Sequence, residues 1–165
     1  MSNRVAAAIA IAVVLCCLAV PGIAHARVGD AEVRAGPRGG PCFTISPREE
    51  RLGAPDLAGL SVSDGRRALW KLSMPPGRSF TLGFAMCVPY GGRVASLPQS
   101  PAAELEPGKI YYLHIDSRSA RGVNAAAAYE ARFCLARQRD GSVYVHQIWA
   151  ADQEGRHLFG CLPPD

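Results

Sequence analysis

Residues 125–149 read AAAAYEARFCLARQRDGSVYVHQIW, and this stretch decides the fold class. Its second half, Val143–Trp149, has the β-branched and aromatic composition of a strand. Its first half permits two interpretations, because four alanines suit a helix whereas apolar residues at every second position over Tyr129–Leu135 suit a strand. The dipeptide Asp140-Gly141 between the halves is typical of a tight hairpin turn. It favours two antiparallel strands.

A two-residue turn also determines which residues of the hairpin face each other. With Asp140-Gly141 as that turn, we expect Phe133 opposite Ile148 and Leu135 opposite His146. Cys134 then lies on the other face of the sheet.

The rest of the chain adds further strands with turns between them. Strand patterns occur at Cys42–Ile45, Leu60–Ser63, Ala68–Met74, Ile110–Ile115 and Phe80–Cys87, the last expected as a core strand with Phe80, Leu82, Phe84 and Met86 inward. Asp64-Gly65 predicts a hairpin, and Glu106–Lys109 matches a type II turn. Ser46–Arg51 predicts one helical turn, and His157–Cys161 a last short strand. About seven strands predict an all-β protein, an antiparallel β-sandwich or small barrel.

The 165 residues suffice for a single domain. Residues 1–26 have a basic start, an apolar run and the ending Ala24-His25-Ala26, which predicts a signal peptide cleaved after Ala26. The apolar run is shorter than a membrane span, and Cys16 and Cys17 lie inside it, where a lipid anchor does not form. We expect a flexible segment at 27–40, with an edge strand around Ala31–Arg34, then one disulfide-containing β domain at 41–165. The expected location is the periplasm.

The cysteines beyond the predicted cleavage site are Cys42, Cys87, Cys134 and Cys161. An even number in an exported chain predicts two disulfides, with three pairings possible. We expect Cys42–Cys87 and Cys134–Cys161, because the second pair flanks the last hairpin. A zinc site is not expected, since no two of these cysteines are close in sequence.

The sequence offers no constellation typical of catalysis. The histidines after the signal peptide are His114, His146 and His157, and we expect His114 and Asp116 not to form a dyad because neighbouring strand residues point to opposite faces. Met74 and Met86 could suit copper, but both are expected in the core. The net charge of +4 comes from scattered basic residues, which argues against nucleic-acid binding. We therefore expect no enzyme, no cofactor and no metal.

Four segments together resemble a family of bacterial periplasmic proteins assigned as type VI secretion immunity proteins, many of them lipoproteins. They are Pro41–Ile45, Cys87–Gly91, Leu105–Tyr111 and Tyr129–Leu135. The resemblance covers residues 41–149, and Cys161 also stands in its expected place. It implies a protein that binds and blocks a toxin delivered into the periplasm. This chain departs from the lipoprotein form, since it lacks a usable acylation cysteine, so no stable membrane anchor is expected.

Two other classes stay open beside an immunity protein. One is an exported enzyme with a dispersed site, and the other is a structural or ligand-binding module of the cell envelope. For a binding protein, we expect the contact surface on the long loops 93–103 and 117–124, which carry Arg, Ser and Gln without core periodicity. The candidate partner-binding residues are Arg93, Gln99, Ser117, Arg118, Arg121 and Asn124.

Overall fold

The computed structural model describes residues 27–78, 80–93, 97–118, 125–149, 151–152 and 160–161. The predicted signal peptide and most of the predicted last strand, 157–159, lie outside these ranges. The named elements are β1 (Val28–Ala35), β2 (Pro41–Ile45), α2 (Pro47–Leu52), β3 (Asp56–Ser63), β4 (Ala68–Ser73), β5 (Val88–Pro89), β6 (Ile110–Arg118), β7 (Ala128–Arg137) and β8 (Val143–Ile148). The protein is all-β, as expected, and residues 128–137 form a strand rather than a helix.

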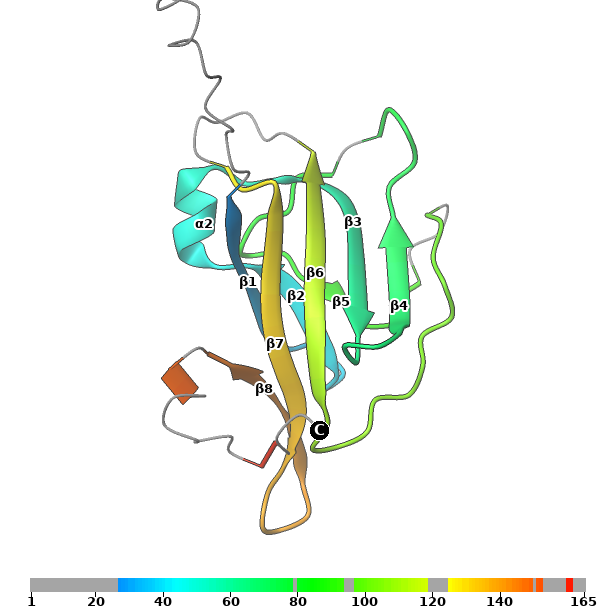
Figure 1. Cartoon of the computed structure of the whole chain (residues 1–165), viewed down its shortest axis with the longest axis vertical. Coiled ribbons are helices and arrows are strands. Elements are labelled where there is room, and N and C mark those ends of the chain that lie inside the picture. Colours follow the sequence, from blue (N-terminus) through cyan, green and yellow to red (C-terminus); the bar gives the residue numbers. More distant parts are fainter. Residues whose placement is uncertain are drawn as a thin grey trace, which may run out of the picture.

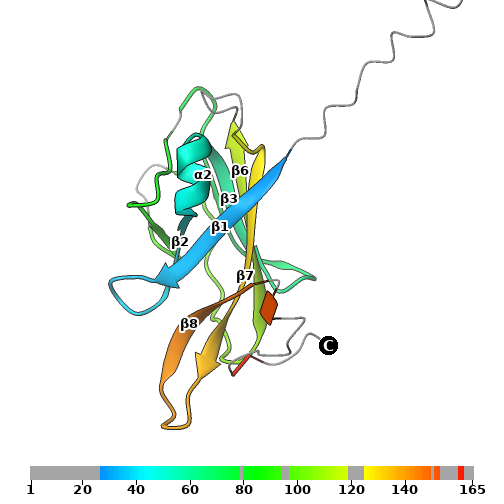
Figure 2. The same ribbon diagram turned by 90° about the vertical axis from the view of Figure 1, so that its left-hand side faces the viewer.

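The strands form an eight-stranded sheet in the order β4-β3-β6-β7-β1-β2-β5, with β8 also paired to β7. The pairings are antiparallel except that of β1 with β7, which is parallel. Strand β7 pairs with β1 along its first residues and with β8 along its second half, so β1 and β8 leave β7 as a fork. The sheet curls into a half-barrel, with β2 and β5 behind β6 and β3 in Figure 1 and β1 crossing β7 steeply in Figure 2.

Strand β1 corrects the expectation of a flexible segment with an edge strand. It is ordered over Val28–Ala35 and lies between β2 and β7 in the sheet. Alternation explains this position, because Gly29, Ala31 and Val33 are buried while the charged residues between them point outward. The charges in this stretch belong to one face of an internal strand.

The expectation of a core strand over Phe80–Cys87 is wrong. The segment is irregular apart from a bridge between Thr81 and Asp56, and Met86 is 44% exposed. Leu82 is fully buried, yet its N–H donates to the carbonyl of Pro55, and the backbone turns between Gly83 and Met86. The alternating apolar residues here belong to a segment that is fixed by a few single hydrogen bonds to distant residues, without a neighbouring strand along its length.

The β7–β8 hairpin forms, but its register differs by one residue from the expectation. Phe133 lies opposite Gln147, and Cys134 lies opposite His146. The reason is the turn: the Gly141 N–H donates to Gln138 at 3.1 Å, and Gly141 has a φ of 85°. A turn followed by a left-handed glycine gives a three-residue loop, so one more residue is used than in a two-residue turn.

The core lies inside the curl, between β2 and the strands β4, β6 and β7. Five aromatic rings meet there: Phe43 contacts Trp70, Tyr90 and Phe133, and Phe133 also contacts Tyr111. Both disulfides form with the expected pairing, Cys42–Cys87 and Cys134–Cys161. The first joins β2 to the segment before β5, and the second joins β7 to the C-terminal part of the chain.

The predicted turns and helical turn are also present. Ser46 caps α2 by accepting a hydrogen bond from the Glu49 N–H, and Pro47 occupies the first turn of the helix. Asp64-Gly65 lies between β3 and β4, and Gly108 has a φ of 90° in the turn before β6. Within the described residues, no helix is both long and apolar enough to cross a membrane.

Candidate functional site

The structure separates the residues predicted to bind a partner. Arg93 is exposed, whereas Gln99 is half-buried and forms a bridge with Leu72 of β4. Ser117 and Arg118 are the last residues of β6 and not part of a loop, which corrects the expected loop boundary. The last two predicted residues, 121 and 124, lie outside the described ranges.

Ser117 and Arg118 both have contacts that hold the fold together. The Ser117 hydroxyl donates to the carbonyl of Ala126 at 2.9 Å. The Arg118 guanidinium donates to the carbonyls of Arg78 at 2.6 Å and Met74 at 3.2 Å, and so ties the segment after β4 to the end of β6. A role of these side chains in partner binding stays a prediction. Their hydrogen bonds within the fold already explain why Ser and Arg occupy these positions.

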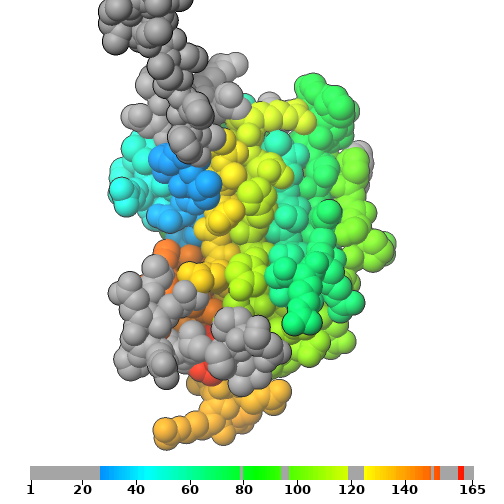
Figure 3. All heavy atoms as spheres, viewed as in Figure 1, coloured from blue at the N-terminus to red at the C-terminus, as the bar shows by residue number. Residues whose placement is uncertain are grey.

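A different polar group lies on the outer face of β6 and β7, opposite the core. Alternation places Tyr111, Leu113 and Ile115 in the core, so the even-numbered residues of β6 point outward. Pairing of the neighbouring strands brings Ser61, His114, Glu130 and Asp30 into one row across β3, β6, β7 and β1. Figure 3 looks onto this face, where β7 and β6 run between β1 in blue and β3 in green.

His114 is held between two carboxylates on this face. Its Nε2 lies 3.0 Å from Oδ1 of Asp116, and its Nδ1 lies 3.1 Å from Oε1 of Glu130. The expectation that His114 and Asp116 do not meet is wrong, because residues two apart in a strand share a face. The spacing His-x-Asp in a predicted strand indicates that these two side chains share a face. The contact of Glu130 with His114 could be predicted only with knowledge of the β6–β7 register.

This arrangement determines what His114 can do chemically. A neutral imidazole has one N–H, so it donates to one carboxylate at a time, and only the imidazolium donates to both. Ser61 lies opposite His114 in the β3–β6 pairing, but neither ring nitrogen can take a proton from it without leaving a carboxylate. The cluster does not have the geometry of a serine nucleophile with its base.

The two carboxylates also sit poorly for a shared metal ion. They contact opposite nitrogens of the ring, so their oxygens do not converge with a nitrogen on one point. Among the described residues, no group of three His, Cys, Asp or Glu side chains is placed to hold a metal ion.

Beside His114, the outer face is hollowed over the fork between β1 and β8. The hollow has a volume of about 500 Å³. Its lining residues come from β1, β6, β7, β8, the end of β3 and the residue after β8, and they include Asp30, Tyr112, His114, Glu130, Arg132 and Trp149. Two of them are large aromatic residues open to solvent, Tyr112 at 37% and Trp149 at 48% exposure.

Gln147 closes the floor of the fork. Its Oε1 accepts a hydrogen bond from the Val33 N–H at 2.7 Å, and its Nε2 donates to the carbonyl of Ala31 at 3.0 Å. The side-chain amide thus takes the place of a paired backbone segment at the point where β1 has left β7. The hollow therefore has a base held by hydrogen bonds, and all its described lining residues except Trp149 belong to regular strands.

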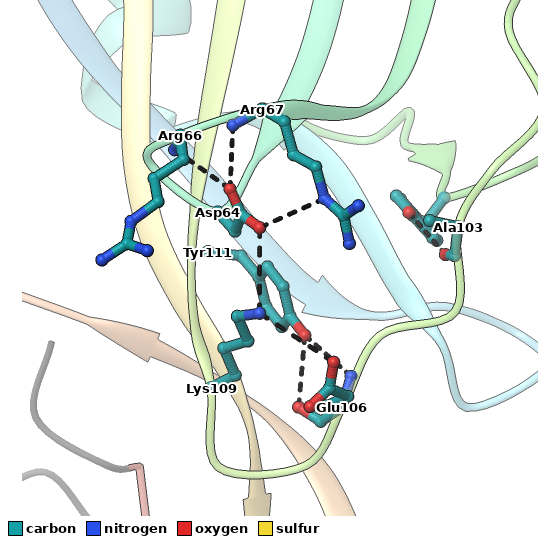
Figure 4. A network of polar contacts seen from close by, with 8 residues as sticks. Asp64, Arg66, Arg67, Ala103, Glu106, Lys109 and Tyr111 are labelled. Atoms are coloured by element: carbon teal, nitrogen blue, oxygen red, sulfur yellow. Dashed lines mark hydrogen bonds and ion pairs between the residues drawn. The ribbon is translucent and has the colours of Figure 1, made fainter. Parts of the chain in front are cut away.

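Two other polar networks support the fold rather than this face. In Figure 4, Asp64 accepts hydrogen bonds from the backbone N–H groups of Arg67 and Arg66 and lies 3.7 Å from Nζ of Lys109. The two backbone hydrogen bonds lower the pKa of Asp64. The Tyr111 hydroxyl accepts from the Glu106 N–H at 2.7 Å, so this network fixes the turns before β4 and β6.

The second network is an ion pair at the start of β1. The Arg27 guanidinium donates to both carboxylate oxygens of Glu49, at 2.8 and 2.7 Å. The Glu49 side chain is only 3% exposed and lies against Gly29 and Tyr129, where a Cβ on Gly29 would be 2.7 Å from Oε2 of Glu49. The hydrogen bonds from Arg27 hold the pKa of Glu49 below its usual value, although burial acts in the opposite direction.

Comparison of the chain with protein-family models, with curated proteins and with solved structures gives no match. The functional interpretation therefore depends on the residues and their geometry.

Proposed function

We propose that this protein acts by binding another protein through the outer face of β6, β7 and β8. The observation that carries the proposal is the hollow on that face, which exposes Tyr112 and Trp149 beside Arg132. Tyr, Trp and Arg are the residue types that contribute most to binding at protein interfaces. Here Tyr112 and Arg132 project from strands and Trp149 directly follows β8, so little backbone conformational entropy is lost when a partner binds.

The form of binding that we propose is that of an immunity protein, which neutralises a toxin delivered by type VI secretion. This form rests on the resemblance of the four sequence segments, and export into the periplasm rests on residues 1–26. Two disulfides support an oxidising compartment. Neutralisation requires complementarity to the toxin and no chemistry by this protein, which agrees with a histidine whose two nitrogens are both engaged.

An envelope ligand-binding module is the second candidate, and the size of the hollow favours it. A volume of about 500 Å³ falls in the range of small-molecule sites. Such sites enclose most of their ligand, whereas this hollow is formed on the outer side of a sheet. The position of the hollow thus favours a partner that covers the surrounding surface as well.

Affinity capture with matched surface variants tests the proposal. The bait is the oxidised chain from residue 27, and the test variant is Tyr112→Ala with Trp149→Ala. The control is Met86→Ser with Val143→Ser, which removes two other exposed apolar residues that do not line the hollow. A third variant, Arg93→Ala with Gln99→Ala, tests the predicted loop.

We expect the wild type and the control to capture the same protein and the hollow variant to lose it. Equal capture by all variants would overturn the assignment to this face, and loss with the loop variant alone would favour residues 93–103. Co-expression of this protein with the captured one in the periplasm tests neutralisation. Survival that depends on Tyr112 and Trp149 supports immunity, and turnover of cell-wall or lipid substrates by the purified protein would contradict a binding role.

A further inference from the structure

The hollow carries more negative than positive charge. Asp30 and Glu130 both line the hollow and are direct partners in the β1–β7 pairing, and Asp116, which is not a lining residue, contacts the other nitrogen of His114. Among the described residues that line the hollow, Arg132 is the only lysine or arginine. The whole chain, in contrast, has a net charge of +4. An acidic hollow on a basic protein is a local feature that average composition does not explain.

Asp30 is the member of this group with the least compensation. Within the described ranges, its carboxylate makes no ion pair and no side-chain hydrogen bond. The nearby Arg27 interacts electrostatically with Asp30 but directs two of its hydrogen bonds to Glu49. Glu130 uses one oxygen for His114, and its side chain is 60% exposed. Two neighbouring carboxylates therefore have free acceptor positions.

Aromatic surface adjoins these acceptors. Tyr112 precedes His114 on the same face of β6, and Trp149 follows the end of β8. Both line the hollow together with Asp30 and Glu130. A lysine or arginine side chain matches this combination, since its methylene stem packs on aromatic rings while its charged end bonds to carboxylates.

We propose that the hollow receives a lysine or arginine side chain of the partner protein, with its cation between Asp30 and Glu130 and its stem against Tyr112 and Trp149. The inference rests on the proposed function, because it names the chemistry of the partner at the same face. An acidic partner segment would meet the two carboxylates and gain only Arg132, so charge complementarity favours the basic one.

Peptide titration followed by NMR tests this inference without the partner. The probes are the blocked tripeptides acetyl-Gly-Lys-Gly-amide and its arginine form, with the Nε-acetyl-lysine and glutamate forms as controls. The chain has two tryptophans, so the spectrum contains two indole N–H signals. Trp70 is 1% exposed in the core and serves as the internal reference, and Trp149 reports the hollow.

We expect the lysine and arginine peptides to shift the Trp149 signal in a saturable way, and the acetyl-lysine and glutamate peptides to leave it unchanged. Asp30→Asn should weaken binding of the lysine peptide about fivefold, as for the loss of one partly exposed charge pair. Arg132→Gln should strengthen binding of this peptide, because a like charge is removed. Glu104→Gln is the matched control, since Glu104 is exposed outside the hollow and should change nothing.

A Trp149 signal that does not move, or that moves equally with the acetyl-lysine peptide, would overturn the inference. Binding that is unchanged by Asp30→Asn would overturn it as well. The capture experiment separates the two levels. Loss of the partner with Tyr112→Ala and Trp149→Ala but not with Asp30→Asn would support the proposed function and contradict binding of a basic side chain. Capture that is retained by both variants would contradict the proposed binding face itself.

Discussion

The two faces of the β6–β7 pair are made by the same strands and have opposite characters. On the inner face, Tyr111, Leu113 and Phe133 are at most 1% exposed and pack against other rings and aliphatic side chains. On the outer face, His114 and Glu130 are partly exposed to solvent and contact each other through a hydrogen bond of 3.1 Å. Packing of the inner face specifies the fold, while most of the outer face is free to carry function. Substitutions on the two faces should therefore separate stability from binding.

The largest effect is expected from Phe133→Ala on the inner face. Phe133 is fully buried, and its ring centroid lies 5.6 Å from those of both Phe43 and Tyr111. Truncation removes these contacts and leaves a cavity, so the free energy of unfolding should fall by about 3–5 kcal/mol. Chemical denaturation of the oxidised protein measures this change.

The matched control is Arg132→Gln, one residue away on the outer face. We expect it to change the free energy of unfolding by less than about 1 kcal/mol, because surface substitutions have small effects. Similar losses in the two variants would show that the faces are not energetically distinct.

A smaller loss is expected when the charge buried on the inner side loses its partner. Glu49 is 2% exposed, so Arg27→Met leaves its carboxylate buried without a cation. Removing one partner of a fully buried pair costs about 3–5 kcal/mol, and with Arg27 at 41% exposure we expect about 2 kcal/mol at pH 7. The control is Arg38→Met in the exposed turn between β1 and β2.

The pH dependence of this loss has a definite sign. The pKa of Glu49 in the folded protein is lowered, chiefly by the hydrogen bonds from Arg27. The stabilisation is therefore present above the unfolded pKa of about 4.3 and disappears as the pH falls through the folded value. Unfolding of the wild type and Arg27→Met should differ most at pH 7 and least near pH 3. A difference that grows on acidification would contradict the ion pair as its source.

The fork between the two faces should respond more weakly to Gln147→Ala. This change removes two hydrogen bonds, to the Val33 N–H and the Ala31 carbonyl, which are partly buried. We expect a loss of about 1–2 kcal/mol in the free energy of unfolding. Gln147→Glu keeps an acceptor for the Val33 N–H and loses the donor to the Ala31 carbonyl. Its free energy of unfolding should therefore lie between those of the wild type and Gln147→Ala. Gln138→Ala, at an exposed glutamine, is the control and should have little effect.

Sequence periodicity predicted the inner face better than the outer one. The alternation in β6 and β7 identified strands correctly, because burial of every second side chain leaves a direct mark on composition. It failed at Phe80–Cys87, where the same pattern belongs to an irregular segment held by single backbone hydrogen bonds to Pro55 and Leu57. It also missed β1 as an internal strand, because charged residues on its outer face suggested flexibility.

The candidate site depended on information that periodicity does not contain. His114 and Asp116 could be placed together from their spacing, but Glu130 and Asp30 join them only through pairings between distant strands. Trp149 lines the hollow from just beyond the end of β8, and the observed register places Ile148 opposite Arg132 on the same face. The disulfide pairing was accessible from the sequence, since the last hairpin brings Cys134 and Cys161 to one end of the sheet.

The smallest effect on stability is expected on the outer face, from His114→Gln. Its contacts to Asp116 and Glu130 are 3.0 and 3.1 Å long, but all three side chains are substantially exposed. Solvent screening limits such contacts to less than about 1 kcal/mol, so the free energy of unfolding should change little. Asp116→Asn removes one contact and should change it even less. A loss of 2 kcal/mol or more in His114→Gln would show that the cluster holds β6 to β7 as part of the fold. Stability that is retained, together with a changed Trp149 response to the lysine peptide, would place the cluster in binding, because the substitution alters the hydrogen bonding of Glu130 in the hollow while the inner face stays intact.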